Sequence, residues 1–339
     1  MSKARQLADL GNVYDDGALS NRNLIINGAM QVAQRGTSFT ADNVFTLDRW
    51  KSGDGTGGSP ARTLSQETFT LGQTDVPNAH YYLKHDQTTA STNGNSSLIQ
   101  KVEDVTRFDG QTVTLSFYAK ADAAMDVDVR FIQDFGTGGS PSSDVTLTET
   151  VSIGTSWAKY TVTKTMGSLS GKTLGTDGVH TSFLNLNFEF QPTSTFTFEG
   201  ALFQLEYGDT ATPFEHRSYG DELAKCQRYF EIVQPESGQQ ASGIAVGYHL
   251  STTEAAMHYF YKVKKRTEPD FTVTGQSNIR INHTGTSRNI SSGTITISSA
   301  SGVDAARMVL TGASGSLGDG DGSSMGFVGD GSLRFDAEL

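Results

Sequence analysis

The sequence predicts a mainly β protein: an antiparallel jelly-roll β-sandwich, followed by a short helix and a second small β domain. Apolar and polar residues alternate almost perfectly from Phe183 to Phe190, and the odd positions are apolar from Val113 to Ala119. Alternation with a period of two is typical of strands that bury one face. Gly is abundant, with 37 residues against 7 Pro, which favours many short strands joined by tight turns.

The same reasoning predicts further strands in both β domains. In the first domain the alternation continues at 127–131, 157–163 and 196–206. In the second domain the predicted strands are 244–250, 255–263, 271–274, 279–281, 294–297, 303–310 and 333–337. Residues 312–331 are rich in Gly, Ser and Asp, so we expect a loop there.

One segment between the two β domains has helical spacing. Its apolar and amide residues recur every three or four positions, at Leu223, Cys226, Gln227 and Phe230, after Ser218 or Asp221 as the N-cap. The predicted organisation is therefore a polar leader at 1–22, the sandwich at 23–218, a helical linker at 219–235 and the C-terminal β domain at 236–339.

Charge and composition exclude several classes of function. The net charge is −11 and the basic residues are scattered, which argues against nucleic acid as a partner. We find no apolar run long enough for a membrane span and no signal peptide, so we expect synthesis in a cytoplasm and no membrane insertion. The single cysteine, Cys226, excludes an intrachain disulfide and a Cys-based zinc site.

No local signature of catalysis or of a cofactor is present. Gly53, Gly55 and Gly58 match a dinucleotide-binding pattern, but Ser59-Pro60 follows where that motif requires a helix. The histidines have no metal-ligand spacing, and they are His80, His85, His180, His216, His249, His258 and His283. We therefore predict a protein that is not an enzyme and that holds no cofactor.

Two weaker candidate sites remain. Asp319, Asp321 and Asp330 resemble part of a calcium loop, but Ser324 stands where the EF-hand pattern has its Gly. A flexible loop is therefore the preferred interpretation. Tyr81 and Tyr82 point to opposite faces if they lie in a strand, and an exposed aromatic ring can stack on a sugar. Packing in the core is the alternative for this pair.

The predicted strand at 255–263 is apolar on both faces. Met257, Tyr259, Tyr261 and Val263 share one face, and Phe260 lies on the other. A strand of this kind is either central in a packed core or part of a subunit interface.

Several motifs resemble phage tail-fibre and receptor-binding proteins with a carbohydrate-binding-module-like sandwich. The most specific is NLIINGAMQVAQRGTSF at 23–39, followed by Asp48-Arg49-Trp50. Similar segments are VTLSFYAK at 113–120, QLEYG at 204–208, ATPFEHR at 211–217 and ELAKCQRYFE at 222–231. The resemblance spans about 21–231 and transfers a fold more securely than a binding site.

Structural roles follow for the residues of these motifs. Asn27 and Gly28 are expected to form a turn with positive φ. Asp48 and Arg49 are expected to cap the buried ring of Trp50 with a charge pair. Pro213 is expected to end the last strand of the sandwich.

The resemblance implies a structural component of a phage particle, a tail fibre or similar appendage, that contacts host surface glycans during adsorption. Its partners would be other virion proteins, bound through the leader at 1–22, two further copies in a homotrimer, and host polysaccharide. Its location would be the virion. Two alternatives stay open: a purely structural virion protein, such as a head fibre, decoration or tail adaptor, and a polysaccharide depolymerase.

Overall fold

The computed structural model describes residues 21–54, 61–90, 96–177, 181–190, 193–283, 286–290, 293–298, 301–313, 317–318 and 320–339. The predicted leader at 1–22 lies, except for its last two residues, outside the described residues. The chain divides into two compact units, Met1–Glu222 and Leu223–Leu339. Within the described part, no helix combines the length and apolar character that crossing a bilayer requires.

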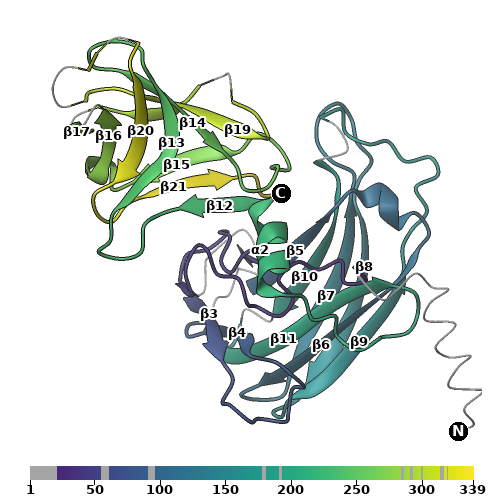
Figure 1. Cartoon of the computed structure of the whole chain (residues 1–339). Helices are drawn as coiled ribbons and strands as arrows, with labels where there is room; N and C mark the ends of the chain where they lie inside the picture. Colours follow the sequence, from purple (N-terminus) through teal and green to yellow (C-terminus); the bar gives the residue numbers. More distant parts are fainter. Residues whose placement is uncertain are drawn as a thin grey trace, which may run out of the picture. The chain divides into compact units, whose positions relative to one another are not determined.

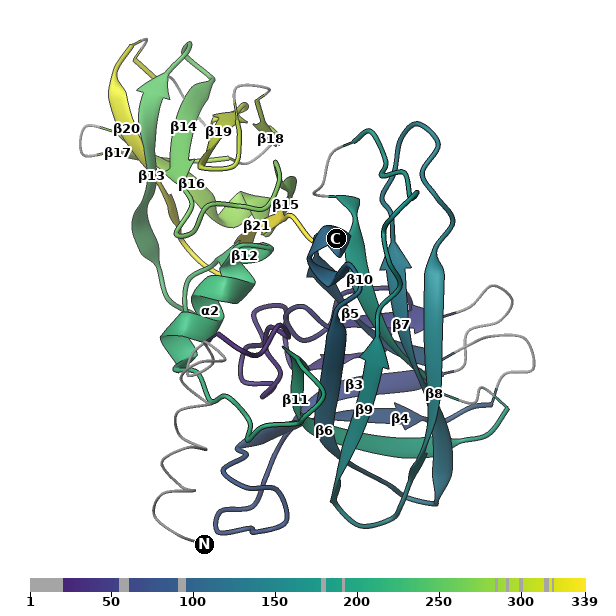
Figure 2. The same cartoon turned by 90° about the vertical axis from the view of Figure 1, so that its right-hand side faces the viewer.

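The first unit is an antiparallel β-sandwich, as predicted, and its two sheets form separate layers (Figures 1 and 2). One sheet has six strands, in the order β1 (Ser38–Phe39), β3 (Arg62–Thr68), β4 (Tyr81–Gln87), β11 (Phe196–Tyr207), β6 (Thr112–Ala121) and β9 (Ala158–Thr165). The other has five, in the order β2 (Lys51–Asp54), β5 (Ser96–Glu103), β10 (Phe183–Phe190), β7 (Met125–Asp134) and β8 (Val145–Ile153). A short 3-10 helix, η1 (Val105–Phe108), follows β5.

The sandwich is filled by aromatic side chains from both sheets. Phe117 and Phe203 of the six-stranded sheet stack with ring centroids 5.5 Å apart. Phe188 of the five-stranded sheet packs edge-on against both, at 5.3 Å. Trp50 contacts Phe203 at 4.9 Å. Burial of such rings is the main stabilising contribution to the fold.

The segment from Asn23 to Gly28 docks on β11 and closes the sandwich at one end. The Leu24 N–H donates to the Leu205 carbonyl at 2.8 Å, and the Phe203 N–H donates to the Gly28 carbonyl at 2.9 Å. The Asn23 side chain accepts from the Leu205 N–H at 3.1 Å and donates to the Phe203 carbonyl at 3.0 Å. These bonds satisfy backbone groups of β11 that no strand pairs.

β11 is bulged where this segment meets it. Its register against β6 shifts between Ala201 and Gln204, and Leu202 has φ of +51°. Gly28 lies so close to the bulge that a Cβ atom would stand 2.1 Å from the Phe203 carbonyl oxygen. Glycine is therefore required at position 28 for close approach, whereas the positive φ of the predicted turn, +59°, belongs to Asn27.

Asn27 holds together three parts of this end of the sandwich. Its side-chain amide donates to the carbonyls of Val32 and Asp48 at 2.8 and 3.1 Å, and its Oδ1 accepts from the Val32 N–H at 2.9 Å. Its own carbonyl accepts from Trp50 Nε1 at 3.1 Å. The residue is fully buried.

Two residues of the DRW motif have partners elsewhere in the chain. Asp48 accepts from the Gln34 N–H at 2.6 Å, and Arg49 donates to the Lys101 carbonyl at 2.6 Å. The polar group of the Trp50 ring is satisfied by Asn27. Asp48 and Arg49 thus bind the backbone of other segments. The expected charge pair over the Trp50 ring did not include these bonds.

The expectation that Pro213 ends the last strand is wrong. β11 ends at Tyr207 and is followed by Gly208, whose φ is +104°. That left-handed residue turns the chain out of the sheet. Pro213 lies further along, where its carbonyl accepts from Arg22 at 3.1 Å.

The helical linker is shorter than predicted. The helix α2 (Tyr219–Gln227) begins after Ser218, whose hydroxyl accepts from the Asp221 N–H at 3.1 Å. The predicted linker at 219–235 also contains β12 (Phe230–Val233), which pairs with a strand near the C-terminus. Phe230 and Glu231 are buried at 3% and 0% exposure, so packing in the second unit overrides the helical spacing there.

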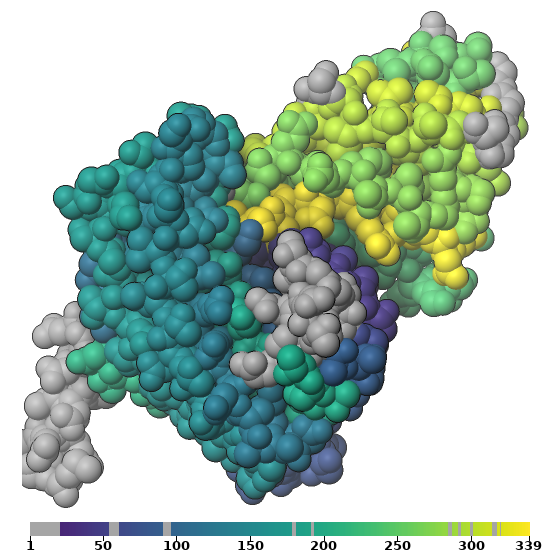
Figure 3. All heavy atoms as spheres, turned by 180° about the vertical axis from the view of Figure 1, so that it is seen from behind, coloured from purple at the N-terminus to yellow at the C-terminus, as the bar shows by residue number. Residues whose placement is uncertain are grey.

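The second unit contains two further antiparallel sheets. The smaller has the order β12, β21 (Ser332–Asp336) and β15 (Asp270–Thr274). The larger has the order β17 (Thr286–Asn289), β16 (Ile279–His283), β20 (Gly322–Phe327), β13 (Ala241–His249), β14 (Ala255–Phe260), β19 (Ala305–Leu310) and β18 (Ile295–Ile297). A short 3-10 helix, η3 (Gln276–Asn278), precedes β16. Residues near the chain end (yellow) and earlier green segments share one surface of this unit (Figure 3).

Two expectations about the second unit need correction. The segment 312–331 is not only a loop, because β20 lies within it and pairs with β13 and β16. Its Gly and Ser residues conceal the alternation of buried Met325 and Phe327. The strand expected at 255–263 ends at Phe260, which is 71% exposed.

A buried ion pair lies beside α2 in this unit. Lys265 Nζ and Glu231 Oε2 are 2.5 Å apart and both side chains are fully buried. Lys265 also donates to the Gln227 carbonyl, and the Tyr259 hydroxyl donates to Glu231. Removing one partner of such a buried pair destabilises the fold, because the other charge then stays buried without its partner.

We predict that Asn27→Ala lowers the free energy of unfolding of the first unit by about 3 kcal/mol, because it leaves buried peptide groups unsatisfied and puts Ala at a positive φ. Both tryptophans, Trp50 and Trp157, lie in this unit. Tryptophan fluorescence during urea unfolding therefore reports on the first unit alone. The matched control is Asn43→Ala, at an exposed residue with φ of +54°, which should cost about 1 kcal/mol. Equal losses would contradict the role given to the Asn27 side chain.

We predict that acid destabilises the first unit through His85. Burial, and then the charge of Arg62, lower the pKa of His85 from 6.5 to about 3. Below about pH 6.5, His85 is protonated in the unfolded chain, whereas in the folded chain it stays neutral until the pH falls to about 3. The folded state therefore loses stability relative to the unfolded state as the pH falls through this window. Between pH 7 and 5 the stability advantage of the wild type over His85→Gln should shrink by about 2 kcal/mol. An advantage that stays constant with pH would show that folded His85 accepts the proton.

Candidate functional site

The outer side of the six-stranded sheet carries a cluster of aromatic residues. Tyr82 of β4 and Tyr118 of β6 alternate with core residues and so point away from the sandwich interior. Phe69 follows β3 and Trp157 precedes β9. These four rings pack together with Leu202 and Phe214. We call this surface, made of Phe69, Tyr82, Tyr118 and Trp157, the aromatic face.

Three of the rings contact one another directly. The centroids of Phe69 and Tyr82 are 4.7 Å apart, and those of Phe69 and Trp157 are 5.2 Å apart. Tyr82 and Trp157 meet edge-to-face at 5.6 Å. All three residues are half-buried, so each ring is held by neighbours and still offers part of its surface to a ligand.

Charged groups border these rings. Lys120 Nζ lies 5.5 Å from the centre of the Trp157 ring and 2.9 Å from Glu199 Oε2. Burial, together with Glu199 and Glu67, raises the pKa of Tyr82 above its usual value. The Tyr82 hydroxyl therefore keeps its proton at physiological pH and can donate a hydrogen bond.

A cavity of about 340 Å³ adjoins the aromatic face. Its lining includes Tyr118 and Ser116 of β6, Lys159 of β9, and Leu202 at the bulge of β11. Phe214 and His216 of the segment after β11 line it as well. Aromatic walls with a few hydroxyl, amine and imidazole groups are typical of sites for small polar ligands.

His216 contributes an uncharged ring to this cavity. Burial, and then the neighbouring His80, lower the pKa of His216. Its ring meets Phe214 edge-on at 4.9 Å. A neutral imidazole offers one donor and one acceptor, which suits a hydroxylated ligand.

A second hollow, also about 340 Å³, lies on β3 and β4 and is polar. Its lining includes Thr63, Ser65, Glu67, Lys84 and Asp86, which share the outward orientation of Tyr82. Lys84 and Asp86 form an ion pair at 3.7 Å. The outer side of the sheet thus carries aromatic and hydrogen-bonding groups from β3 to β9.

The two predicted tyrosines separate as alternation requires. Tyr82 lies on the aromatic face, whereas Tyr81 packs against the sandwich core. Sequence reasoning missed Phe69, Tyr118 and Trp157 as partners of Tyr82. Phe69 and Trp157 lie just outside strands, and Tyr118 and Trp157 are distant from Tyr82 in sequence, so only the folded sheet shows that these rings share one surface.

The calcium candidates do not assemble into one site. Asp321 and Asp330 lie beyond opposite ends of β20, whose six residues span about 20 Å. Asp330 accepts a hydrogen bond from the Gly238 N–H at 3.2 Å. Asp319 lies outside the described residues.

No family model matches the chain, and no curated protein matches it. It is similar to the family 11 carbohydrate-binding module of the cellulosomal cellulase Lic26A-Cel5E of Clostridium thermocellum, with 14% identity, a TM-score of 0.32, and coverage of 52% of this chain and 98% of that one.

Two further solved structures show the same degree of likeness. The family 30 module of cellulase Cel9D-Cel44B of Clostridium thermocellum has 16% identity, a TM-score of 0.28, and coverage of 48% and 93%. The enzymatically active domain of tailspike protein 4 of bacteriophage CBA120 has 11% identity and a TM-score of 0.36, and the match covers 55% of this chain but 22% of the tailspike chain.

Proposed function

We propose that the first unit binds carbohydrate on its aromatic face, and that the chain is an appendage protein of a phage particle that contacts host surface glycans. The observation that carries the proposal is the contact between Phe69, Tyr82 and Trp157, beside a cavity of about 340 Å³.

The chemistry of the aromatic face fits a sugar ring. One side of a pyranose is rich in C–H groups and packs on aromatic rings much as apolar groups do. The hydroxyls at its rim need donors and acceptors, which Tyr82, Lys120 and Glu199 supply around Trp157. The cavity adds Ser116, Lys159 and His216 for a second sugar unit.

The proposal assigns binding without cleavage. Glu199 is held by Lys120 at 2.9 Å, which suits a fixed acceptor for sugar hydroxyls. Incubation with host envelope polysaccharide should release no new reducing ends. Their release would favour the depolymerase alternative.

The phage setting is supported by the resemblance of residues 23–39 and of Asp48-Arg49-Trp50 to tail-fibre proteins. An oligomer is supported by an apolar surface on the second unit. Val246, Tyr248 and Phe260 are 56%, 43% and 71% exposed, and the register of β13 with β14 puts them on one side of the sheet. Exposed apolar surfaces of this kind favour subunit contacts.

We predict that Trp157→Ala weakens binding to host envelope polysaccharide by about tenfold or more, because a stacking aromatic contributes upward of about 1.4 kcal/mol. Binding is measured by isothermal titration with soluble polysaccharide fragments. Trp157→Phe keeps a ring and should retain most of the affinity.

The matched control is Tyr219→Ala, an aromatic residue that is 57% exposed and lies at the start of α2. It should bind as the wild type does. Full affinity in Trp157→Ala would contradict the assignment of the aromatic face. Absence of binding by the wild type to any host polysaccharide would favour the purely structural alternative.

We predict that light scattering behind size exclusion gives a mass three times that of one chain. Phe260→Asp should lower that mass, because it places a charge in the proposed contact. A wild-type monomer would contradict the trimer, and a trimer unaffected by Phe260→Asp would place the contact elsewhere.

A further inference from the structure

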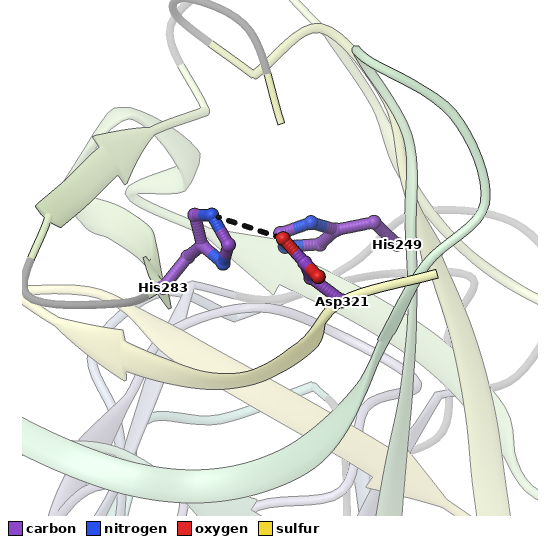
Figure 4. A group of neighbouring side chains, drawn as sticks. All are labelled: His249, His283 and Asp321. Atoms are coloured by element: carbon purple, nitrogen blue, oxygen red, sulfur yellow. Dashed lines mark ion pairs between the residues drawn. The ribbon is translucent and has the colours of Figure 1, made fainter. Parts of the chain in front are cut away.

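Three side chains with metal-binding donor atoms converge at one end of neighbouring strands of the larger sheet in the second unit (Figure 4). His249 ends β13, Asp321 precedes β20 and His283 ends β16. β13, β20 and β16 are neighbours in this sheet and run antiparallel in turn. The end of one strand therefore lies beside the start of the next.

The register also puts the three side chains on the same side of the sheet. Tyr248 pairs with Gly322, so His249 lies opposite Asp321, and the His249 N–H donates to the Asp321 carbonyl at 3.0 Å. Asn282 pairs with Ser324, so His283 lies opposite the residue two positions after Asp321. Residues two apart in a strand share a face.

His249 is oriented as a metal ligand is. Its Nδ1 and the carbonyl oxygen of Gly318 are 2.7 Å apart, which assigns the ring proton to Nδ1. Its Nε2 is buried and has no hydrogen-bond partner among the described residues. The residue is 1% exposed. A histidine that donates one ring N–H to a carbonyl and directs the other lone pair toward further ligands is the usual arrangement at zinc sites.

The donor atoms lie at distances that a small cation can bridge. One ligand atom from each of His249, His283 and Asp321 lies within 4.8 Å of the others. His283 Nε2 and Asp321 Oδ2 are 3.5 Å apart, the dashed contact in Figure 4. Tetrahedral zinc with bonds of about 2.0–2.1 Å requires its ligand atoms to be roughly 3.3 Å apart, so small side-chain rotations suffice.

We propose that His249, His283 and Asp321 bind a divalent transition-metal ion, with Zn²⁺ as the best fit. Two imidazoles and one carboxylate suit zinc and related ions, whereas Ca²⁺ and Mg²⁺ prefer oxygen ligands alone. Asp321 is half-exposed, with 52% of its side chain accessible, so water can take the fourth position. The bound ion ties β13, β16 and β20 together at one end of the sheet.

The test is a titration of the full-length chain, freed of metal with a chelator, with ZnCl₂ in a calorimeter. We expect one Zn²⁺ per chain. His283→Ala and Asp321→Asn each remove a ligand, so they should weaken binding by more than the roughly 10–100-fold that loss of an outer partner of a ligand costs. CaCl₂ should produce no binding heat.

The matched control is His258→Ala, a histidine on the other side of the same sheet, which should bind Zn²⁺ as the wild type does. Asp321 is exposed enough that Asp321→Asn should keep the fold, so this variant decides the matter if His283→Ala misfolds. The proposal is overturned if the wild type binds no stoichiometric Zn²⁺, if Asp321→Asn binds it with unchanged affinity, or if Ca²⁺ binds in its place.

Discussion

The first unit depends on the docking of one irregular segment, 23–28, against the bulged strand β11. Hydrogen bonds from Asn23 and Gly28 occupy the backbone of β11 where its register shifts. A side chain at position 28 would collide with the Phe203 carbonyl, so the contact is a close backbone approach. Arg217, after the bulge, returns to the same segment and donates to the Ile25 carbonyl at 3.1 Å. The beginning and the end of the sandwich are thereby joined.

The same contact shapes the candidate binding site. The bulge gives Leu202 a positive φ, and Leu202 then lines the cavity beside Tyr118. The chain that leaves β11 must cross the outer side of the sheet, where it brings Phe214 and His216 to that cavity. Architecture and proposed function are thus linked: the features that close the sandwich also build one wall of its outer surface.

Alternation of apolar residues predicted the sandwich strands β6, β7, β9, β10 and β11, but not β3, β4, β5 or β8. It also predicted the opposite orientations that Tyr81 and Tyr82 have in a strand, because side chains alternate across a strand. It could not predict which strands are neighbours. Trp157 meets Tyr82 across β11 and β6, which lie between β4 and β9 in the sheet, and sequence order alone gives no sign of that contact. Alternation gives no signal where small residues dominate, as in β20, whose Gly and Ser residues carry little hydrophobic character. With β20 unrecognised, the approach of His249, His283 and Asp321 was invisible, because they belong to three separate segments of sequence.

The central claim is that the aromatic face is the surface that meets sugar, and the two tryptophans allow a direct measurement. Trp157 lies on this face, whereas Trp50 is fully buried and donates to the Asn27 carbonyl. We would record the indole N–H resonances of ¹⁵N-labelled protein while adding fragments of host envelope polysaccharide. The account predicts that the Trp157 resonance shifts progressively to saturation while the Trp50 resonance stays in place. Saturable binding that leaves Trp157 unchanged would contradict it.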